Sequence, residues 1–314
     1  MAQTLETLHI ERKHEGGLVD AYELGDRIKL AHASLQAVAD SCGIDILHVK
    51  GYAALDGFYP ASRFSTDADI LVRPSQVDDL IGHLVRRKWE RVADFTSGSA
   101  FQHAATYRHS WWGAVDIHRN FPGIQRAPED GFDLLWAGRQ TAPIAHFPCT
   151  VPAYLDQLLI ILLHAGRDGY RGTQDAAYIR SILSDADMED IRRRAVQLRG
   201  EVALAASLGE LEEYRSHPDY LLWKFMSQGG SRLDEWVARW TAARTMRGKI
   251  AVVTSALMVN KDHLAIRLGH KPSRLDIASE WMARNRHAGN EAVQRLVKMW
   301  GQRSGDEDNG QNRG

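Results

Sequence analysis

Cysteine is scarce in this sequence of 314 residues, which contains two, Cys42 and Cys149. Neither has a second cysteine at the short spacing of a zinc site or of a Cys-x-x-Cys redox motif. This scarcity excludes a small scaffold held together by disulfides and a metal centre built from cysteines. We expect two unpaired thiols in a reducing cytoplasm.

Long apolar runs are also absent. The longest strongly apolar run, Leu158–Leu163, is far shorter than the roughly 20 residues that a membrane-spanning helix needs. The first residues, MAQTLETLHIERKHEGG, lack the apolar core of a secretory signal peptide. We therefore expect a cytoplasmic protein without a membrane partner.

The sequence has no surplus of either charge, because 39 basic residues face 40 acidic ones, for a net charge of −1. A protein that follows a nucleic-acid backbone usually concentrates Lys and Arg, so this balance disfavours nucleic acid as a partner. The contents of 44% hydrophobic and 25% charged residues are those of an ordinary globular protein. The length is sufficient for two domains with separate cores.

The first half of the sequence, residues 1–150, alternates segments typical of helices and of strands. Apolar residues recur at helical spacing from Leu18 to Ser41 and from Pro74 to about Trp89. A short helix is predicted at Tyr52–Phe58, and the exposed amides at its start near Gly51 suit a phosphate. Strands are predicted at Ile44–Val49, from Asp67 onward, and in a hairpin of Gln102–His109 with Trp112–His118. These elements predict a mixed sheet of four or five strands with helices.

The second half is predicted to be almost entirely helical. The predicted helices are Tyr154–Gly166, Thr173–Leu183, Asp187–Leu198, Val202–Tyr214, Ser231–Val259 and Ser273–Trp300. The fold class is therefore α+β, with a catalytic domain at residues 1–150 and a helical domain at 151–303. The polar, glycine-rich residues 304–314 are predicted to be a disordered tail. A glycine-rich loop at 166–172 has the composition of either a ligand-facing connection or an exposed turn between helices.

Three carboxylates fall on predicted strands. Asp67 and Asp69 are two residues apart, so their side chains share one face of their strand, while apolar neighbours pack on the other face. Asp116 lies in a second apolar strand, and His118 shares its face. Carboxylate oxygens are the protein ligands that Mg²⁺ prefers. Adjacent strands could thus hold Mg²⁺ ions between these residues.

A basic turn precedes the first acidic pair. Lys50-Gly51 ends a predicted apolar strand and stands ahead of Asp67 in the segment HVKGYAALDGFYPASRFSTDADILV. Lysine can pair with phosphate oxygens, and glycine allows a ligand to approach the backbone closely. The turn and the acidic pair together indicate a phosphate site beside a divalent-metal site.

The order and spacing of these elements resemble the nucleotidyltransferase superfamily that includes the DNA polymerase beta-like fold. More narrowly, the segment from about residue 44 to 121 is similar to an uncharacterised bacterial nucleotidyltransferase family. The shared pattern is Lys50-Gly51, Tyr59-Pro60, Arg63, Asp67-Ala68-Asp69 and Val115-Asp116-Ile117-His118. Tyr52 departs from the wider superfamily, in which another Gly or a Ser usually follows the glycine and touches the triphosphate.

The resemblance implies transfer of a nucleoside monophosphate to an acceptor hydroxyl. Asp67, Asp69 and Asp116 would hold two Mg²⁺ ions, with Mn²⁺ as a substitute, and Asp116 would help to remove the acceptor proton. ATP is the favoured donor because it is abundant in cells. The acceptor would be a small molecule, a peptide or a protein.

The resemblance also implies roles for the basic residues. Lys50 and Gly51 would bind the β- or γ-phosphate, and Arg63 would neutralise the leaving pyrophosphate. His118 would be a partner of Asp116 or an acceptor-side group. In the helical half, His164 and Asp175 resemble family positions near the nucleotide.

Other interpretations of the same residues exist. Asp67 could begin a strand without binding metal, Asp116 could pair with Arg119, and Lys50 could extend to solvent. The Asp-x-Asp pair could be the manganese site of a nucleotide-sugar glycosyltransferase, although only about 65 residues precede it to form a nucleotide-binding sheet. The chain could also be a nucleotide-binding interaction module without transfer activity.

Overall fold

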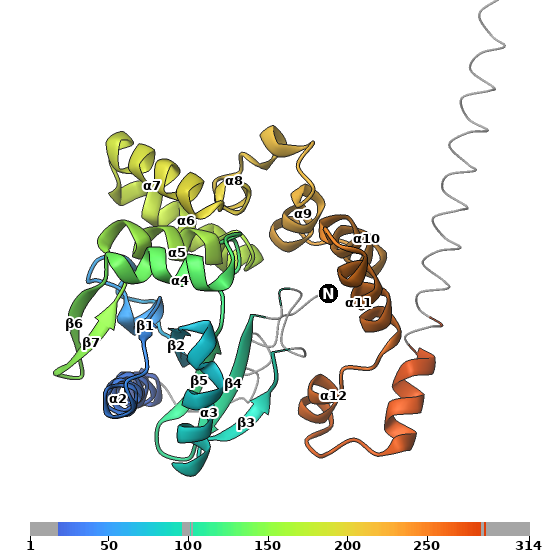
Figure 1. The fold of residues 1–314 in the computed structure, drawn as a ribbon, viewed down its shortest axis with the longest axis horizontal. Helices are drawn as coiled ribbons and strands as arrows, with labels where there is room; N and C mark the ends of the chain where they lie inside the picture. The colour runs from blue at the N-terminus through green and yellow to red at the C-terminus, as the bar shows by residue number, and fades with distance from the viewer. Residues whose placement is uncertain (1–17, 96–100, 102, 284–285, 287–314) are drawn as a thin grey trace, which may run out of the picture. The chain divides into compact units, whose positions relative to one another are not determined.

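The computed structural model describes residues 18–95, 101, 103–283 and 286, and Figure 1 shows their fold. The chain divides into two compact units, one at residues 2–229 and one formed chiefly by residues 230–314. The domain boundary predicted at residues 150 and 151 falls at the end of a strand inside the first unit and stays a prediction. The predicted tail at 304–314 lies outside the described residues.

A five-stranded mixed sheet is the centre of the first unit (Figure 1). The strand order is β1-β2-β5-β4-β3; β2 and β5 are parallel, and the other pairs are antiparallel. The strands are β1 (Ile46–His48), β2 (Asp67–Val72), β3 (Glu90–Ala93), β4 (Ala104–His109) and β5 (Gly113–His118). The predicted mixed sheet is confirmed, while Gln102, the predicted start of the hairpin, lies outside the described residues.

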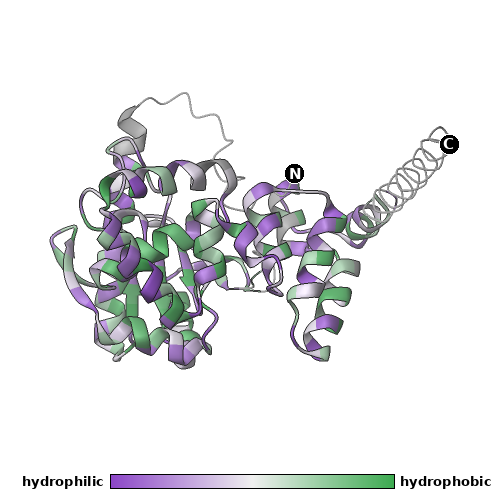
Figure 2. Ribbon diagram, turned by 90° about the horizontal axis from the view of Figure 1, so that it is seen from above, coloured by the Kyte–Doolittle hydropathy of each residue, from purple (hydrophilic) through white to green (hydrophobic). Residues whose placement is uncertain are grey.

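Helices cover both faces of this sheet, although only one face of the central strands β2 and β5 is apolar throughout, because their residues alternate between the two faces. On one face, α2 (Leu18–Cys42) and α3 (Val77–Arg86) pack on Ile70, Val115 and Ile117. On the other, α4 (Pro128–Ala137) and α5 (Tyr154–Ala165) share a core with strand residues such as Leu71. Figure 2 shows hydrophobic residues along these strands and helices.

The α5 helix is buried almost all round, from Asp156 to Ala165, as expected of a helix that is apolar on every side. The helices that pack on it are α6 (Gly169–Ile182), α7 (Asp185–Leu198) and α8 (Glu201–Leu208). A further helix of the first unit, α9 (Tyr220–Gln228), packs on α6 and α8. Between α4 and α5 the chain forms a hairpin of β6 (Gln140–Ile144) and β7 (Phe147–Val151). None of α4, α9, β3, β6 and β7 is predicted by the sequence patterns above.

Three predicted helices are markedly shortened or interrupted in the structure. The helix predicted at 52–58 is a single 3-10 turn at Gly51–Ala53, since Gly57 has a positive φ of 87° and Pro60 follows. The helix predicted at 202–214 ends before Gly209, whose φ is 78°, and resumes as a short 3-10 helix, Leu211–Tyr214. The helix predicted at 231–259 is two helices in the second unit.

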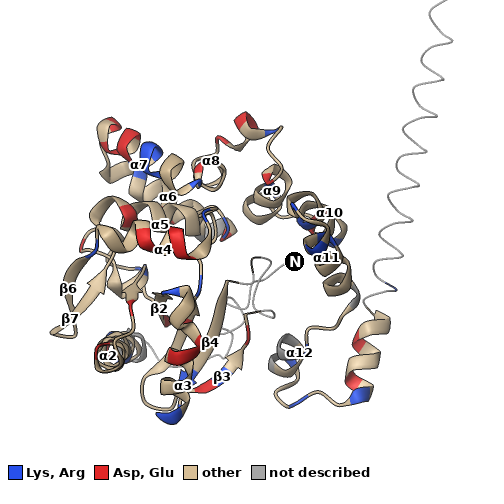
Figure 3. Cartoon of the chain, viewed as in Figure 1, with Lys and Arg blue, Asp and Glu red and all other residues tan. Residues whose placement is uncertain are grey.

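The second unit contains α10 (Arg232–Ala242), α11 (Met246–Leu257) and α12 (Lys261–Leu268), followed by helical residues 274–283. Thr245 separates α10 from α11, because its side chain accepts a hydrogen bond from the Gly248 amide and starts a new helix. Residues 287–300 of the last predicted helix lie outside the described residues. The charged residues of α11 are basic, whereas those of α4 in the first unit are acidic (Figure 3).

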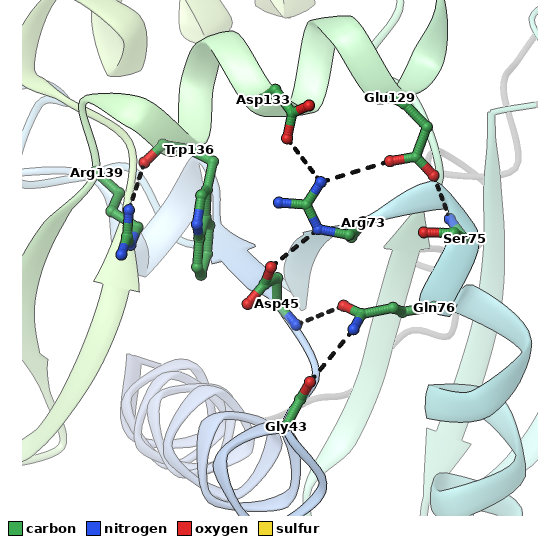
Figure 4. A network of polar contacts seen from close by, with 9 residues as sticks. All are labelled: Gly43, Asp45, Arg73, Ser75, Gln76, Glu129, Asp133, Trp136 and Arg139. Carbon is green, nitrogen blue, oxygen red and sulfur yellow. Dashed lines mark hydrogen bonds and ion pairs between the residues drawn. The ribbon is translucent and has the colours of Figure 1, made fainter.

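A group of charged residues fastens α4 to the sheet, and we call it the Arg73 cluster (Figure 4). The Arg73 guanidinium lies 2.9 Å from Asp45, 2.6 Å from Asp133 and 3.6 Å from Glu129. It also lies 4.6 Å from the centre of the Phe132 ring. One cation thus joins the end of β2, the entry to β1 and two turns of α4.

No described helix is both long enough and apolar enough to cross a membrane.

Candidate active site

Asp69 and Asp116 are brought together by the register of the two parallel strands. Asp69 on β2 is the Cα partner of Asp116 on β5, and both side chains are buried. His118, two residues after Asp116, is completely buried on the same side of β5. The candidate ligand atoms of these three residues lie within 4.8 Å of one another. We call these residues, with Lys50 and His164, the Asp69 cluster.

The hydrogen bonds of this cluster indicate which atoms are donors and which are acceptors. His118 Nε2 lies 2.8 Å from Asp69 Oδ1, and because a carboxylate only accepts, Nε2 carries the proton. In the neutral ring, Nδ1 of His118 is then an acceptor, and it is buried without a hydrogen-bond partner among the described residues. From β4, the Thr106 hydroxyl donates to Asp116 Oδ1 over 2.6 Å. Both carboxylates are therefore oriented by neighbours.

Lys50 adds a buried positive charge to the same carboxylate. Its Nζ lies 3.0 Å from Asp69 Oδ1 and 3.3 Å from His164 Nε2 on α5. Since an ammonium only donates, His164 Nε2 is the acceptor and its Nδ1 carries the proton. Lys50 thus contacts the predicted metal ligand Asp69 directly, and His164, also proposed from sequence, contacts Lys50.

The turn after β1 has an unusual backbone. Lys50 has φ 48° and ψ −174°, and Gly51 has φ 54°, so two successive residues have the positive φ that favours glycine. A Cβ on Gly51 would lie 2.5 Å from the hydroxyl oxygen of Ser65. Glycine is required here by the loop before β2 as well as by the turn itself.

Arg63 and Asp175 form a second pair of sequence-predicted residues. Arg63 Nε lies 3.5 Å from Asp175 Oδ1, and its guanidinium lies 5.4 Å from the centre of the Tyr59 ring. Burial and the Asp175 carboxylate raise the pKa of the Tyr59 hydroxyl. The Lys50 charge opposes this rise in the Tyr59 pKa, so the Arg63 pair and the Asp69 cluster are electrostatically coupled.

Asp67 lies outside the close group of ligand atoms. It begins β2 one pleat before Asp69, opposite Ala114 on β5, and is partly exposed. Residues two apart on a strand share a face but stand about 6.5 Å apart. The structure therefore places Asp67 beside the buried group rather than within it.

Two residues near the site have no counterpart among the sequence-predicted residues. Arg167 is buried in the glycine-rich loop after α5, and its Nη1 donates to His103 Nε2 over 2.9 Å. The His103 ring in turn lies 5.1 Å from the His118 ring, centre to centre. The loop predicted at 166–172 is shorter in the structure, because α6 begins at Gly169. Gly172, inside α6, lies so close to the end of α5 that a Cβ there would be 2.0 Å from the Ala165 carbonyl oxygen. The high glycine content of this loop was the sequence feature that could have indicated Arg167, because the ligand-facing interpretation of the loop includes that residue.

Comparison with known protein families assigns the chain to a family. A family described as "uncharacterised nucleotidyltransferase" matches residues 30–214, more than half of the sequence. The chain belongs to this family. The match includes the sheet, Lys50, the acidic strands and the helices that carry His164 and Asp175, and it confirms the predicted resemblance, α+β fold and enzyme class. It also favours nucleotidyl transfer over the glycosyltransferase interpretation.

Solved structures resemble this nucleotidyltransferase distantly. The lincosamide antibiotic adenylyltransferase LnuA, solved with lincomycin bound, is 18% identical, with a TM-score of 0.34 over 49% of this chain and 96% of the other. An antigenic nucleotidyltransferase-like protein from Paracoccidioides brasiliensis is 19% identical, with a TM-score of 0.36 over 58% of this chain and 93% of the other. No curated protein matches the sequence.

Proposed function

We propose that this nucleotidyltransferase transfers AMP from ATP to a hydroxyl group of a small molecule, a peptide or a protein. The observation that supports the proposal most strongly is the pair of buried carboxylates, Asp69 and Asp116, in register on parallel strands. Buried carboxylates are costly unless cations or hydrogen bonds compensate them. ATP is preferred as donor because of its cellular abundance, and the net charge of −1 favours an acceptor other than nucleic acid. The free thiols agree with a reaction in the cytoplasm.

The chemistry of the cluster fits a divalent cation. Mg²⁺ takes one or two carboxylates together with phosphate oxygens and water, and Asp69 and Asp116 supply that number. His118 orients Asp69 through the 2.8 Å hydrogen bond of its Nε2, and its Nδ1 is a buried acceptor without a partner among the described residues. An imidazole among the donors also suits Mn²⁺. Asp67, at the more exposed start of β2, would help to hold a second ion near the nucleotide.

Metal ions bound here would neutralise charge on the attacking and leaving oxygens of the reaction. The acceptor oxygen forms a bond to the α-phosphorus, the bond from that phosphorus to the bridging oxygen of pyrophosphate breaks, and pyrophosphate leaves. Asp116, fixed by the Thr106 hydroxyl, accepts the proton of the acceptor hydroxyl. Lys50 and Arg63 place positive charge on the phosphates, and Gly51 allows them to approach the turn.

The decisive experiment measures nucleotide binding by calorimetry. ATP, GTP, CTP and UTP are titrated into the native chain with and without Mg²⁺, and into Asp69→Asn/Asp116→Asn. We expect one nucleotide, ATP, to bind only with Mg²⁺, and the double variant to bind it about 100-fold more weakly. Asp56→Asn, at an exposed position, is the control and should bind like the native chain.

Three results would contradict the proposal. Absence of metal-dependent nucleotide binding by the native chain would favour the interaction-module interpretation. Undiminished binding by a folded double variant would place the nucleotide elsewhere. A sugar nucleotide that bound more tightly than all four triphosphates would instead support glycosyl transfer.

A further inference from the structure

Lys50 pairs with Asp69, one of the proposed metal ligands. Its ammonium lies 3.0 Å from Asp69 Oδ1, the same oxygen that accepts a hydrogen bond from His118 at 2.8 Å. The Lys50 side chain is only 9% exposed, so solvent screens its charge weakly. The buried carboxylate is therefore neutralised by a lysine in the protein without ligands.

The backbone of Lys50 is strained in order to place this charge. Its φ of 48° with ψ of −174° belongs to a region that only glycine populates readily. Lys88 also has a positive φ, of 66°, but its side chain is exposed at the end of α3. Strain of this kind persists where surrounding contacts hold it and is concentrated at functional sites. The strained backbone of this turn thus directs the Lys50 side chain toward Asp69.

A divalent ion and this ammonium would compete for Asp69. A Mg²⁺ or Mn²⁺ ion bound to Oδ1 at its usual distance would lie at most about 5 Å from Lys50 Nζ. Two positive groups so close in a buried site repel each other strongly. Stable metal binding therefore requires Lys50 to leave Asp69, and a departing buried ammonium needs another anion.

We propose that Lys50 is a resident counter-ion of Asp69 that is displaced only when metal and nucleotide bind together. The inference rests on the proposed function, because the new partner of the ammonium is a triphosphate oxygen. His164 Nε2, 3.3 Å from Nζ, remains an acceptor for the ammonium as it moves. Metal alone binds weakly, and metal with a triphosphate binds tightly. Lys50 thus prevents free metal from occupying the site until its ammonium moves to the triphosphate.

The test measures binding of Mn²⁺ alone by the electron paramagnetic resonance signal of the free ion. Lys50→Met and Lys50→Gln remove the charge, and each should bind Mn²⁺ about tenfold or more tightly than the native chain. Lys50→Arg retains a charge and should bind Mn²⁺ as weakly as the native chain does. Lys88→Met is the matched control, because it removes an exposed lysine with a positive φ, and should leave Mn²⁺ affinity unchanged.

A second titration follows α,β-methylene ATP, which resists transfer, by calorimetry at fixed Mn²⁺. The native chain should bind it at least about tenfold more tightly than Lys50→Met does, since the ammonium has moved to the triphosphate. Circular dichroism confirms the fold of each variant, and use of two neutral variants leaves the test intact if one fails to fold.

The outcomes separate this inference from the proposed function. Equal Mn²⁺ affinity for the native chain and both neutral variants overturns the counter-ion role but leaves the metal site intact. Tight Mn²⁺ binding by the native chain without nucleotide overturns it as well. Absence of Mn²⁺ and nucleotide binding in every variant and in the native chain overturns the proposed function itself.

Discussion

Arg73 and Lys50 are basic residues near opposite ends of β2, and their surroundings differ in every respect. Arg73 is partly exposed, faces three carboxylates and has an ordinary backbone, with φ −52° and ψ 122° (Figure 4). Lys50 is buried, shares one carboxylate oxygen with His118 and has a strained backbone. In the Arg73 cluster, three carboxylates surround one guanidinium. In the Asp69 cluster, the Lys50 ammonium and His118 Nε2 both contact the same oxygen, Asp69 Oδ1.

This difference agrees with a structural role for the Arg73 cluster and with the proposed functional role of the Asp69 cluster. The Arg73 cluster connects three segments of the chain, so we infer that its contacts were selected for stability. The Asp69 cluster contains strain and a buried imidazole nitrogen without a partner, and both features cost free energy that folding alone does not require. Local conflict of this kind is expected where a site is built for a ligand.

The largest expected effect is loss of stability in acid. It should come from two buried histidines between α2 and β1 and not from the Arg73 cluster. His32 on α2 and His48 on β1 are completely buried, and their Nδ1 atoms lie 2.7 Å apart. The Gln36 Oε1 accepts from the Thr150 amide, so His48 Nε2, 3.1 Å away, must donate to it. His48 Nδ1 then accepts from His32 Nδ1, and both rings are neutral.

Burial lowers the pKa of His32 to about 4, against the opposing attraction of Asp69. In the unfolded chain the pKa is about 6.5, so between these values the unfolded state binds more protons. The contribution of His32 to stability is therefore complete above pH 6.5 and is lost as the pH falls toward 4, by about 3 kcal/mol. Urea unfolding at a series of pH values measures this slope.

Matched variants assign the slope to the buried pair. His32→Phe should flatten the decline of the unfolding free energy between pH 6.5 and 4. His146→Gln, at an exposed position, should leave it unchanged. A His32→Phe slope parallel to the native one would mean that other groups cause the acid sensitivity.

The second effect separates stability from binding at Arg73. Arg73→Met should lower the free energy of unfolding by about 1–2 kcal/mol, because three carboxylates and the Phe132 ring lose their cation. Nucleotide affinity of the folded variant should equal that of the native chain. Urea unfolding and calorimetry measure the two quantities.

The control for this variant is an ordinary surface arginine. Arg193 is 63% exposed and pairs with Asp190 on the same helix, so Arg193→Met should cost less than about 0.5 kcal/mol. If Arg73→Met weakens nucleotide binding instead, the Arg73 cluster contributes to the site and the proposed division between the clusters is wrong.

The central fold and half of the site follow from the sequence because they depend on local periodicity. Alternation along each apolar strand places Asp69 with Asp67 on one face and Asp116 with His118 on one face, and the resemblance adds that the two strands belong to one site. The elements that escaped prediction have weak local signals. The β6–β7 hairpin contains Pro143 and Pro148 on paired positions, and proline argues against a strand.

The remaining part of the site depends on contacts between distant segments. Lys50 meets His164 across 114 positions of sequence, and Arg167 meets His103 across 64. No spacing rule relates such residues, since the packing of α5 on the sheet creates these contacts. The positive φ of Lys50 is equally hidden, because lysine in sequence does not indicate a turn that favours glycine.

The smallest expected effect is a difference in stability that tests the backbone strain at Lys50 directly. Lys50→Ala and Lys50→Gly both remove the ammonium, so their difference in stability reports on the backbone of residue 50 alone. We expect the glycine variant to be more stable by about 1 kcal/mol, since relief of strain exceeds the added entropy of the unfolded chain. At Arg73 the same pair should have the opposite order, with alanine more stable by about 0.5–1 kcal/mol, because φ there is −52°. Urea unfolding of the four variants measures both differences, and the same order at both positions would show that Lys50 is not strained.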